Sequence, residues 1–493
     1  MRLPGKSLTI AVSVACLLPI CAFGPNATDP ARAALPDVIV TAAPVYQPLA
    51  ALRGGERFPK GAQLLLIHDG KPAPLVPGFA ASADANVSFD GKSVVFAGKQ
   101  AAGDPWQTWE LTLANGKLRR LIAGAADTIR PFYLPAGQLV YAQRTPADFQ
   151  LLVAGKASAN LFAPIDAEAG KTLLPLSYMT ASAIPTDVLL DGRILFESGF
   201  PLGSGSTPEM FLVYSDGSGV ESYRCDHGAA RWGGKQLASG DVVFTHGSSL
   251  ARFTSPLAHE ARIAAPPAEY AGDLAETTSG DWLLSARPSP SAHFALKLWK
   301  NASSSKSAVA AFETVLAVKG DDVIQPVLVA PRTRPHHHPT GLHAWSYANL
   351  LALDARQSRA GDLKTVPAAV RLETMDAAGH AVETGAAPVE SDGSFFVQVP
   401  ADRPIRFALL DSKGAVVRRE QGWFWIRKGE QRYCVGCHTG PERAPENHVP
   451  AVLNRTTTPV DLRGDLAAGV THDKTSESPR TATPPPAKTP GGN

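Results

Sequence analysis

Two cysteines and a histidine near the C-terminal end of the chain form its clearest chemical motif. Cys434, Cys437 and His438 read C-x-x-C-H within "QRYCVGCHTGPERAPEN", residues 431–447. In this pattern two thiols add across the vinyl groups of a haem, and the adjacent imidazole is placed to bind the iron. The spacing therefore favours covalently attached haem c.

Two other kinds of site use the same residue types. A redox dithiol of the thioredoxin kind opens a helix after a strand in a βαβ pattern, whereas the surroundings here are rich in strand signals and Gly440-Pro441 follows closely. A structural zinc site needs four ligands, and the motif supplies only three. Haem remains the favoured interpretation.

The second axial ligand of such a haem is an open question. Small cytochromes c use a Met downstream of the motif, but no Met follows His438, and Met375 is the only one nearby. Glu442 and His448 are the candidate ligands, with a surface-loop histidine as the alternative interpretation of His448. A vacant iron position would favour ligand binding or catalysis over simple electron transfer.

A second group of candidate ligands lies far upstream. Cys225 stands in "YRCDHG" beside Asp226 and His227, and His246 follows 21 residues later in "VVFTHGSS". A lone buried Cys is the simpler interpretation. A zinc site that includes Cys225 and His246 is the alternative.

Residues 1–33 have the features of a secretory signal. A basic start precedes "LTIAVSVACLLPICAF", and Ala31-Arg32-Ala33 fits a cleavage site. A lipoprotein site at Cys16 or Cys21, or an uncleaved anchor, is the alternative. We expect an exported, periplasmic protein with no membrane span after signal removal and, with three cysteines left, no disulfide framework.

Composition favours a folded β-rich protein. Hydrophobic residues make up 44% and charged residues 19%, and 43 Gly and 42 Pro favour turns over long helices. A net charge of +2 gives no electrostatic footprint for nucleic acid.

A turn-and-strand element recurs along the first two thirds of the chain. Its copies are "SFDGKSVVF", "LPAGQLVY", "LLDGRILF", "LASGDVVF" and "TTSGDWLLS", centred on Gly91, Gly137, Gly192, Gly240 and Gly280. Repeats of 40 to 55 residues with a following hairpin predict a β-propeller of about six blades. Its sixth blade is expected to be composite, joining 319–329 to 63–76.

The remaining segments complete a mainly β organisation, a propeller followed by a small β-sandwich-like domain that carries the haem motif. The predicted boundaries are a linker at 34–54, the propeller at 55–329, a Pro/His-rich linker at 330–345, the haem c domain at 346–462 and a disordered tail at 463–493.

Two stretches of the C-terminal third carry a family resemblance. They are "VESDGSFFVQVPADRPIRFALLD" and "QGWFWIRKGEQRYCVGCHTGPERAPEN". With the propeller repeats, they make residues 55–462 resemble the α-subunit of hydrazine synthase, a Tol-associated type of propeller joined to a middle haem domain. The "GWFW" segment and the C-x-x-C-H motif are the most specific part.

The resemblance implies roles for particular residues. Cys434 and Cys437 would attach the haem, and His438 would bind iron or zinc. Cys225 would be a zinc ligand contributed by the propeller, with His246 as a weaker candidate. The family has a Tyr four residues after the motif His, where this chain has Glu442. Hydrazine synthesis itself is therefore not expected.

Three functions are compatible with these features. The first is an exported c-type haem protein with a redox or electron-transfer role and a redox partner protein. The second is a haem–zinc enzyme acting on a small nitrogen or oxygen compound. The third is a propeller that binds a partner and uses the haem as a sensor. The sequence predicts neither a catalytic residue nor an oligomeric state.

Overall fold

The computed structural model describes residues 35–157, 173–200, 207–224, 228–303, 312–358, 361–376, 378–436 and 448–464. The chain divides into two units, Met1–Leu35 and Pro36–Asn493, and everything below concerns the second. The predicted signal segment and nearly all of the predicted tail lie outside the described residues.

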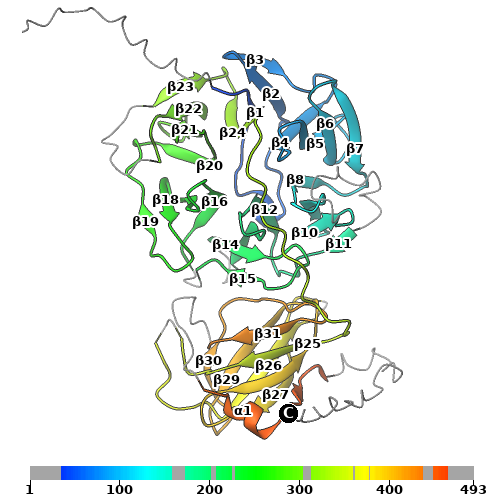
Figure 1. The fold of residues 1–493 in the computed structure, drawn as a ribbon, viewed down its shortest axis with the longest axis vertical. Coiled ribbons are helices and arrows are strands. Elements are labelled where there is room, and N and C mark those ends of the chain that lie inside the picture. The colour runs from blue at the N-terminus through cyan, green and yellow to red at the C-terminus, as the bar shows by residue number, and fades with distance from the viewer. Residues whose placement is uncertain are drawn as a thin grey trace, which may run out of the picture. The chain divides into compact units, whose positions relative to one another are not determined.

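Six four-stranded antiparallel sheets form the blades of a β-propeller (Figure 1). Blade 1 consists of β4 (Ala81–Val87), β5 (Ser93–Lys99), β6 (Gln107–Thr112) and β7 (Lys117–Ile122). Blade 2 consists of β8 (Thr128–Tyr133), β9 (Leu139–Arg144), β10 (Phe149–Ala154) and β11 (Leu173–Pro175). Blade 3 consists of β12 (Ala183–Val188), β13 (Ile194–Phe200), β14 (Thr207–Val213) and β15 (Glu221–Ser222). Blades 4 and 5 consist of β16 (Arg231–Gln236), β17 (Val242–His246), β18 (Ser249–Phe253) and β19 (Ala261–Arg262), and of β20 (Glu269–Glu276), β21 (Trp282–Arg287), β22 (Ala295–Trp299) and β23 (Glu313–Leu316).

The repeated glycines lie in equivalent turns. Each follows the first strand of its blade and has a positive φ, between 74° and 91°, where a residue with a Cβ would be strained. The turn requires this conformation in blades 1 to 5, which explains why the pattern recurs in the sequence.

Blade 6 is composite, as predicted, and closes the ring. Its order is β24 (Asp322–Leu328), β1 (Val38–Ala43), β2 (Gln63–His68) and β3 (Lys71–Pro74). β1 comes from residues predicted as a linker, but it pairs with β24 and β2, and all six of its residues are buried. Pairing the two ends of the propeller in one sheet removes the exposed edges that an open ring would have.

The C-terminal part is a sandwich of two four-stranded sheets. One has the order β31 (Gln431–Cys434), β25 (Ala348–Ala352), β28 (Phe395–Val399) and β32 (Val460–Asp461), and the other β27 (Ala381–Pro388), β26 (Ala369–Met375), β29 (Ile405–Leu410) and β30 (Val416–Arg419). Apolar side chains of both sheets share one buried cluster.

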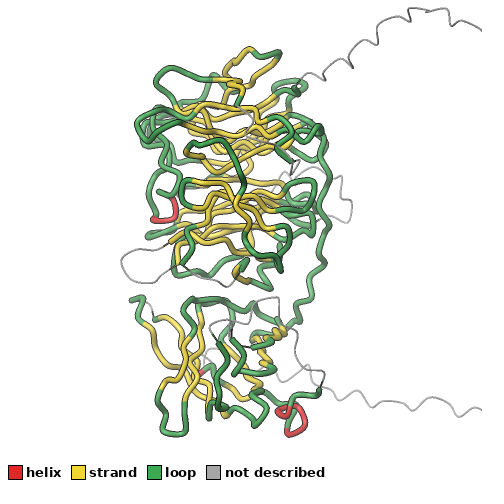
Figure 2. Tube along the Cα trace, turned by 90° about the vertical axis from the view of Figure 1, so that its left-hand side faces the viewer, coloured by secondary structure: helices red, strands yellow, loops and turns green. Residues whose placement is uncertain are grey.

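Helical structure among the described residues is limited to two short segments, η1 (Ala51–Arg53) and α1 (Ala451–Arg455) (Figure 2). Neither is long and apolar enough to cross a membrane.

The innermost strands carry charged side chains into the axis of the propeller. In every blade the pairing register shifts between the innermost strand and the strand beside it. Asp84, Arg130 and Gln325 lie on innermost strands and have positive φ. Arg130 donates two hydrogen bonds of 2.9 Å to Asp273, while Asp84 accepts from Gln325 at 2.8 Å and from Arg57. The Arg130 amide also donates to Asp84 at 3.1 Å, so these buried charges form one network that links blades 1, 2, 5 and 6.

Glu197, on β13 of blade 3, is a buried carboxylate whose pKa is affected by the charges of this axial group. Its carboxylate accepts one hydrogen bond, 3.1 Å from the Gly233 amide, and burial raises its pKa from 4.5 to about 7. Arg130 and Arg57 oppose this rise, and Asp273 adds to it.

We predict a pH-dependent stability from Glu197. Between pH 4.5 and 7 the folded protein keeps a proton that the unfolded chain releases, so the unfolding free energy should fall as pH rises through this window. The slope from this group is at most about 1.4 kcal/mol per pH unit. Denaturant titrations should show a flatter profile for Glu197→Gln, and an unchanged profile would contradict the assignment.

Candidate haem and metal site

Of the two cysteines and the histidine of the C-x-x-C-H motif, Cys434 alone lies within the described part of the chain. It ends β31, where the parallel pairing with β25 sets it opposite Ala352. Cys437, His438 and Glu442 fall in the range 437–447, outside the described residues. The structure thus positions the start of the motif.

An apolar pocket lies directly against Cys434, at one end of the gap between the two sheets. It encloses about 360 Å³, part of it open to solvent. Its lining residues are Leu350, Ala352, Ala355, Phe395, Phe407, Leu409, Glu420, Phe424, Cys434 and Gly436. Burial raises the pKa of the Cys434 thiol, and the Arg432 guanidinium opposes this rise. The thiol therefore faces a largely hydrophobic hollow with a single carboxylate in its wall.

Arg432 connects this pocket to the propeller. Its side chain interacts with Cys434, lies 5.4 Å from the Phe424 ring centre and donates a hydrogen bond to the backbone oxygen of Val220 in blade 3. Within the described part of the chain its buried Nη1 atom has no hydrogen-bond partner, and a Glu430 carboxylate oxygen lies 3.6 Å away. Arg432 is thus fixed from the propeller side while it faces the motif.

The "GWFW" segment provides the main contact between sandwich and propeller. The Trp425 side chain is fully buried within a propeller cluster that includes Phe196 and Phe211. Its Nε1 atom donates to the oxygen of Gly217 at 2.9 Å. A Cβ on Gly217 would lie 2.9 Å from Arg427 Cδ, so only glycine permits this close approach.

His246 occupies the end of β17 in blade 4. Its Nδ1 lies 2.5 Å from Glu260, which also accepts a hydrogen bond of 2.8 Å from Arg231. A carboxylate on one ring nitrogen orients a histidine so that the other nitrogen can bind a metal. Glu260 was not identified from the sequence, because its partner lies on another strand and no local motif marks it. Cys225, Asp226 and His227 lie outside the described residues.

His448 is exposed, and its Nε2 lies 3.3 Å from Asp392, which also binds the amide of Ala451 at the start of α1. As an axial ligand through Nε2, it would have to give up this contact. Among the described residues no group of three or more His, Cys, Asp or Glu side chains is placed to hold a metal ion.

The predicted Pro/His-rich linker lies along the propeller. The amide of Arg332 donates to Phe89, that of His336 donates to Leu190 at 2.9 Å, and the ring of His338 stacks on Tyr214 at 4.0 Å. The linker is therefore in contact with the first turn of blade 1 through Arg332, and its histidine run is in contact with blade 3.

These features define a class of protein: a six-bladed propeller joined through a buried tryptophan to a β-sandwich that bears a C-x-x-C-H motif. Residues 352–439 match the family model described as "Hydrazine synthase alpha subunit middle domain". No curated protein sequence matches the chain.

A solved structure shares the fold over most of the chain. Hydrazine synthase from Kuenenia stuttgartiensis is 17% identical, with 85% of this chain and 72% of that chain covered and a TM-score of 0.71. TolB from Acinetobacter baumannii is 12% identical over 59% of this chain and 66% of that chain, with a TM-score of 0.41. Residues 352–439 thus match the middle domain of the hydrazine synthase alpha subunit, and the fold of the chain matches that of hydrazine synthase, as the resemblance predicted.

We predict that Trp425 dominates the stability of the contact between sandwich and propeller. Trp425→Ala should lower the unfolding free energy by about 3 to 5 kcal/mol, the usual cost of removing a buried large aromatic side chain. Trp345→Ala, which truncates a tryptophan that is 38% exposed, should cost far less. Denaturant unfolding measures both, and equal losses would contradict the proposed role.

Proposed function

We propose that this protein is an exported c-type haem protein with a redox or electron-transfer role. The observation that carries the proposal is the position of Cys434, whose thiol lines an apolar pocket at the start of the C-x-x-C-H motif. The N-terminal segment supports export to the periplasm, a compartment suited to covalent haem attachment.

The residues around Cys434 suit a haem. The macrocycle is flat and largely apolar, and the pocket wall consists of aliphatic and aromatic side chains apart from Glu420. Cys434 and Cys437 would hold the group covalently, and His438 would bind the iron. When bound, the haem supplies one-electron exchange at its iron, with a potential set by its axial ligands and surroundings.

The chain's own residues contribute orientation and exclusion of water. Phe407 and Phe424 line the hollow beside Cys434, and Glu420 adds a carboxylate that accepts a hydrogen bond of 3.0 Å from the Phe407 amide. Arg432 and Trp425 fix this region against blade 3. The propeller would then serve as the docking scaffold for a redox partner protein.

We predict that haem remains attached under denaturing conditions. Electrophoresis with a haem stain should show covalent haem in the protein made by a strain competent in cytochrome c maturation. Cys434→Ala and Cys437→Ala should each remove one thioether bond, and the double variant should lose the stain. Cys225→Ala is the matched control and should keep it; absence of stain in the unaltered protein would refute the proposal.

A haem–zinc enzyme acting on a small nitrogen or oxygen compound is the second candidate, favoured by the carboxylate-oriented imidazole of His246. We predict bound zinc that His246→Ala and Cys225→Ala remove. Glu260→Gln should weaken zinc binding by about 10- to 100-fold, since it acts through His246.

Metal analysis after dialysis against increasing concentrations of a chelator measures the zinc content and zinc affinity of each variant. His380→Ala, which changes an exposed histidine paired with Asp376 at 3.4 Å, is the control. A metal-free protein, or variants that retain all their zinc, would contradict the haem–zinc proposal, and the electron-transfer proposal would then be the only one of the two to stand. Electronic spectra would separately distinguish a six-coordinate low-spin haem from an open high-spin site.

A further inference from the structure

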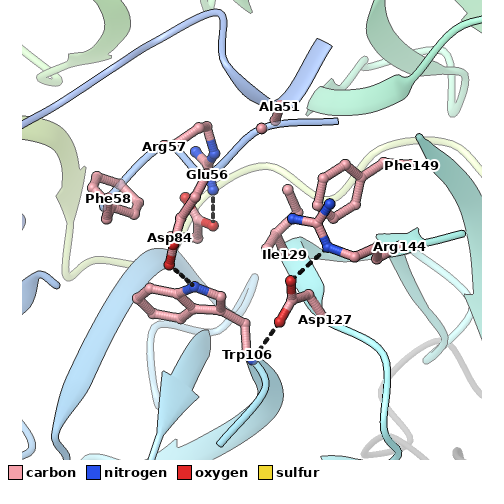
Figure 3. A pocket seen from close by; sticks show the side chains of 11 residues that line it. Ala51, Glu56, Arg57, Phe58, Asp84, Trp106, Asp127, Ile129, Arg144 and Phe149 are labelled. Carbon is pink, nitrogen blue, oxygen red and sulfur yellow. Dashed lines mark hydrogen bonds and ion pairs between the residues drawn. The ribbon is translucent and has the colours of Figure 1, made fainter. Parts of the chain in front are cut away.

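Several arginine side chains inside the propeller are paired with carboxylates. Figure 3 shows two of them at a small hollow between the loop 44–62 and blades 1 and 2. There Arg57 donates to Asp84, and Arg144 Nε donates to Asp127 at 2.7 Å. A carboxylate in direct contact offsets most of the field of a guanidinium at longer range, so these arginines have little electrostatic effect beyond their partners.

Arg432, beside the haem motif, is held differently. Its side chain is 17% exposed, and its Nη2 atom donates to the backbone oxygen of Val220, which carries no net charge. Its Nη1 atom is buried and has no hydrogen-bond partner within the described part of the chain. A Glu430 oxygen lies 3.6 Å from Nη1, too far for a hydrogen bond. The charge of Arg432 is therefore only partly offset by its surroundings.

The carboxylate of Glu430 is held by backbone amides. Its Oε1 atom accepts a hydrogen bond of 3.1 Å from the amide of Gly219, and its Oε2 atom accepts one of 2.9 Å from the amide of Arg427. To approach Arg432 more closely, Glu430 would have to give up these bonds. The incomplete pairing of Arg432 thus follows from the contact between the sandwich and blade 3.

The Arg432 side chain lies beside the first cysteine of the motif. Arg432 and Cys434 share one face of β31, and the two side chains interact. Phe424, whose ring centre is 5.4 Å from the Arg432 guanidinium, lines the same pocket as Cys434. In the proposed haem site a thioether bond joins the macrocycle directly to the Cys434 sulfur, so the guanidinium would lie near the attached edge of the ring.

We propose that Arg432 raises the reduction potential of the haem. This inference rests on the proposed function, because it requires covalent haem at Cys434. When the iron gives one electron to the redox partner protein, the haem gains one positive charge. A fixed cation nearby disfavours that added charge by Coulomb repulsion and so favours the reduced state. Since the Nη1 atom is buried, this repulsion is screened less than it would be at the surface.

Glu420 supplies a charge of the opposite sign at the same site. It lines the pocket at Cys434 and accepts a hydrogen bond of 3.0 Å from the Phe407 amide. Its carboxylate favours the oxidised haem, by the same argument with the sign reversed. Removal of the two charges should therefore shift the potential in opposite directions, which a general disturbance of the fold would not do.

The test is a spectroelectrochemical titration of the full-length protein with its covalent haem. Arg432→Gln should lower the midpoint potential by about 59 mV, the one-electron equivalent of a tenfold fall in the ratio of reduced to oxidised haem. Arg432→Lys keeps the positive charge and should retain most of the potential of the unaltered protein. Glu420→Gln should raise the potential.

Arg371 offers a matched control on β26, in the other sheet of the sandwich. Its side chain is 20% exposed, its Nη2 lies 3.1 Å from a Glu373 oxygen, and its Nε is buried without a hydrogen-bond partner among the described residues. It does not line the pocket at Cys434. Arg371→Gln changes the net charge of the protein by the same amount as Arg432→Gln, and it should leave the potential unchanged.

The haem stain separates this inference from the proposed function. Absence of covalent haem from the unaltered protein would overturn both. If the stain is present, an unchanged potential in Arg432→Gln would overturn only the role of Arg432, as would equal shifts in Arg432→Gln and Arg371→Gln or in Arg432→Gln and Arg432→Lys. If Arg432→Gln fails to fold, Glu430→Gln decides the question: loss of the partly offsetting carboxylate should raise the potential, and an unchanged or lower value would overturn the inference.

Discussion

The burial of Trp425 within the propeller is the interaction on which the position of the candidate haem site depends. The indole belongs by sequence to the sandwich, but its neighbours Phe196 and Phe211 belong to blade 3. Nine residues later the chain reaches Cys434 at the end of β31. A large aromatic side chain buried in this way supplies both stability and a fixed reference point, because a packed core permits few alternative positions.

The contact with blade 3 also covers an edge strand of the sandwich. β31 is an edge strand of its sheet and only four residues long, so one side of its backbone lacks a strand partner. Edge strands in stable proteins are usually short or covered. Here Arg432 of β31 donates to Val220, and Glu430, just before β31, accepts from Gly219 at 3.1 Å, so blade 3 lies against this edge. The strand that carries the motif is thus supported by the propeller.

Much of the propeller could be predicted from the sequence, because its signals are local. A glycine with positive φ recurs at each first turn, and the inner strand of the last repeat lacks a hairpin of its own, which indicated the composite blade. β1 was missed because "VIVTAA" does not alternate between apolar and polar residues; a strand buried on both faces has no polar side to reveal it.

The charged side chains of the axis and of the two candidate sites could not be predicted in the same way. Glu260 is paired with a histidine 14 residues away, Asp84 with an arginine 27 residues away, and Arg130 with an aspartate 143 residues away. Their partners are chosen by blade order and strand register, which exist only in the folded ring. Sequence reasoning finds residues whose chemistry shows in their spacing, as in C-x-x-C-H, but not those brought together by closure of the propeller.

Arg432 is positioned beside Cys434 by two parts of the structure, its own strand β31 and blade 3 of the propeller. Strand alternation places Arg432 and Cys434 on the same face of β31, since side chains two residues apart point the same way. The propeller then holds the guanidinium through Val220, and the Phe424 ring lies beside it. The surroundings of Cys434, the first cysteine of the motif, are therefore set partly by blade 3, so the propeller contributes to the structure of the candidate haem site.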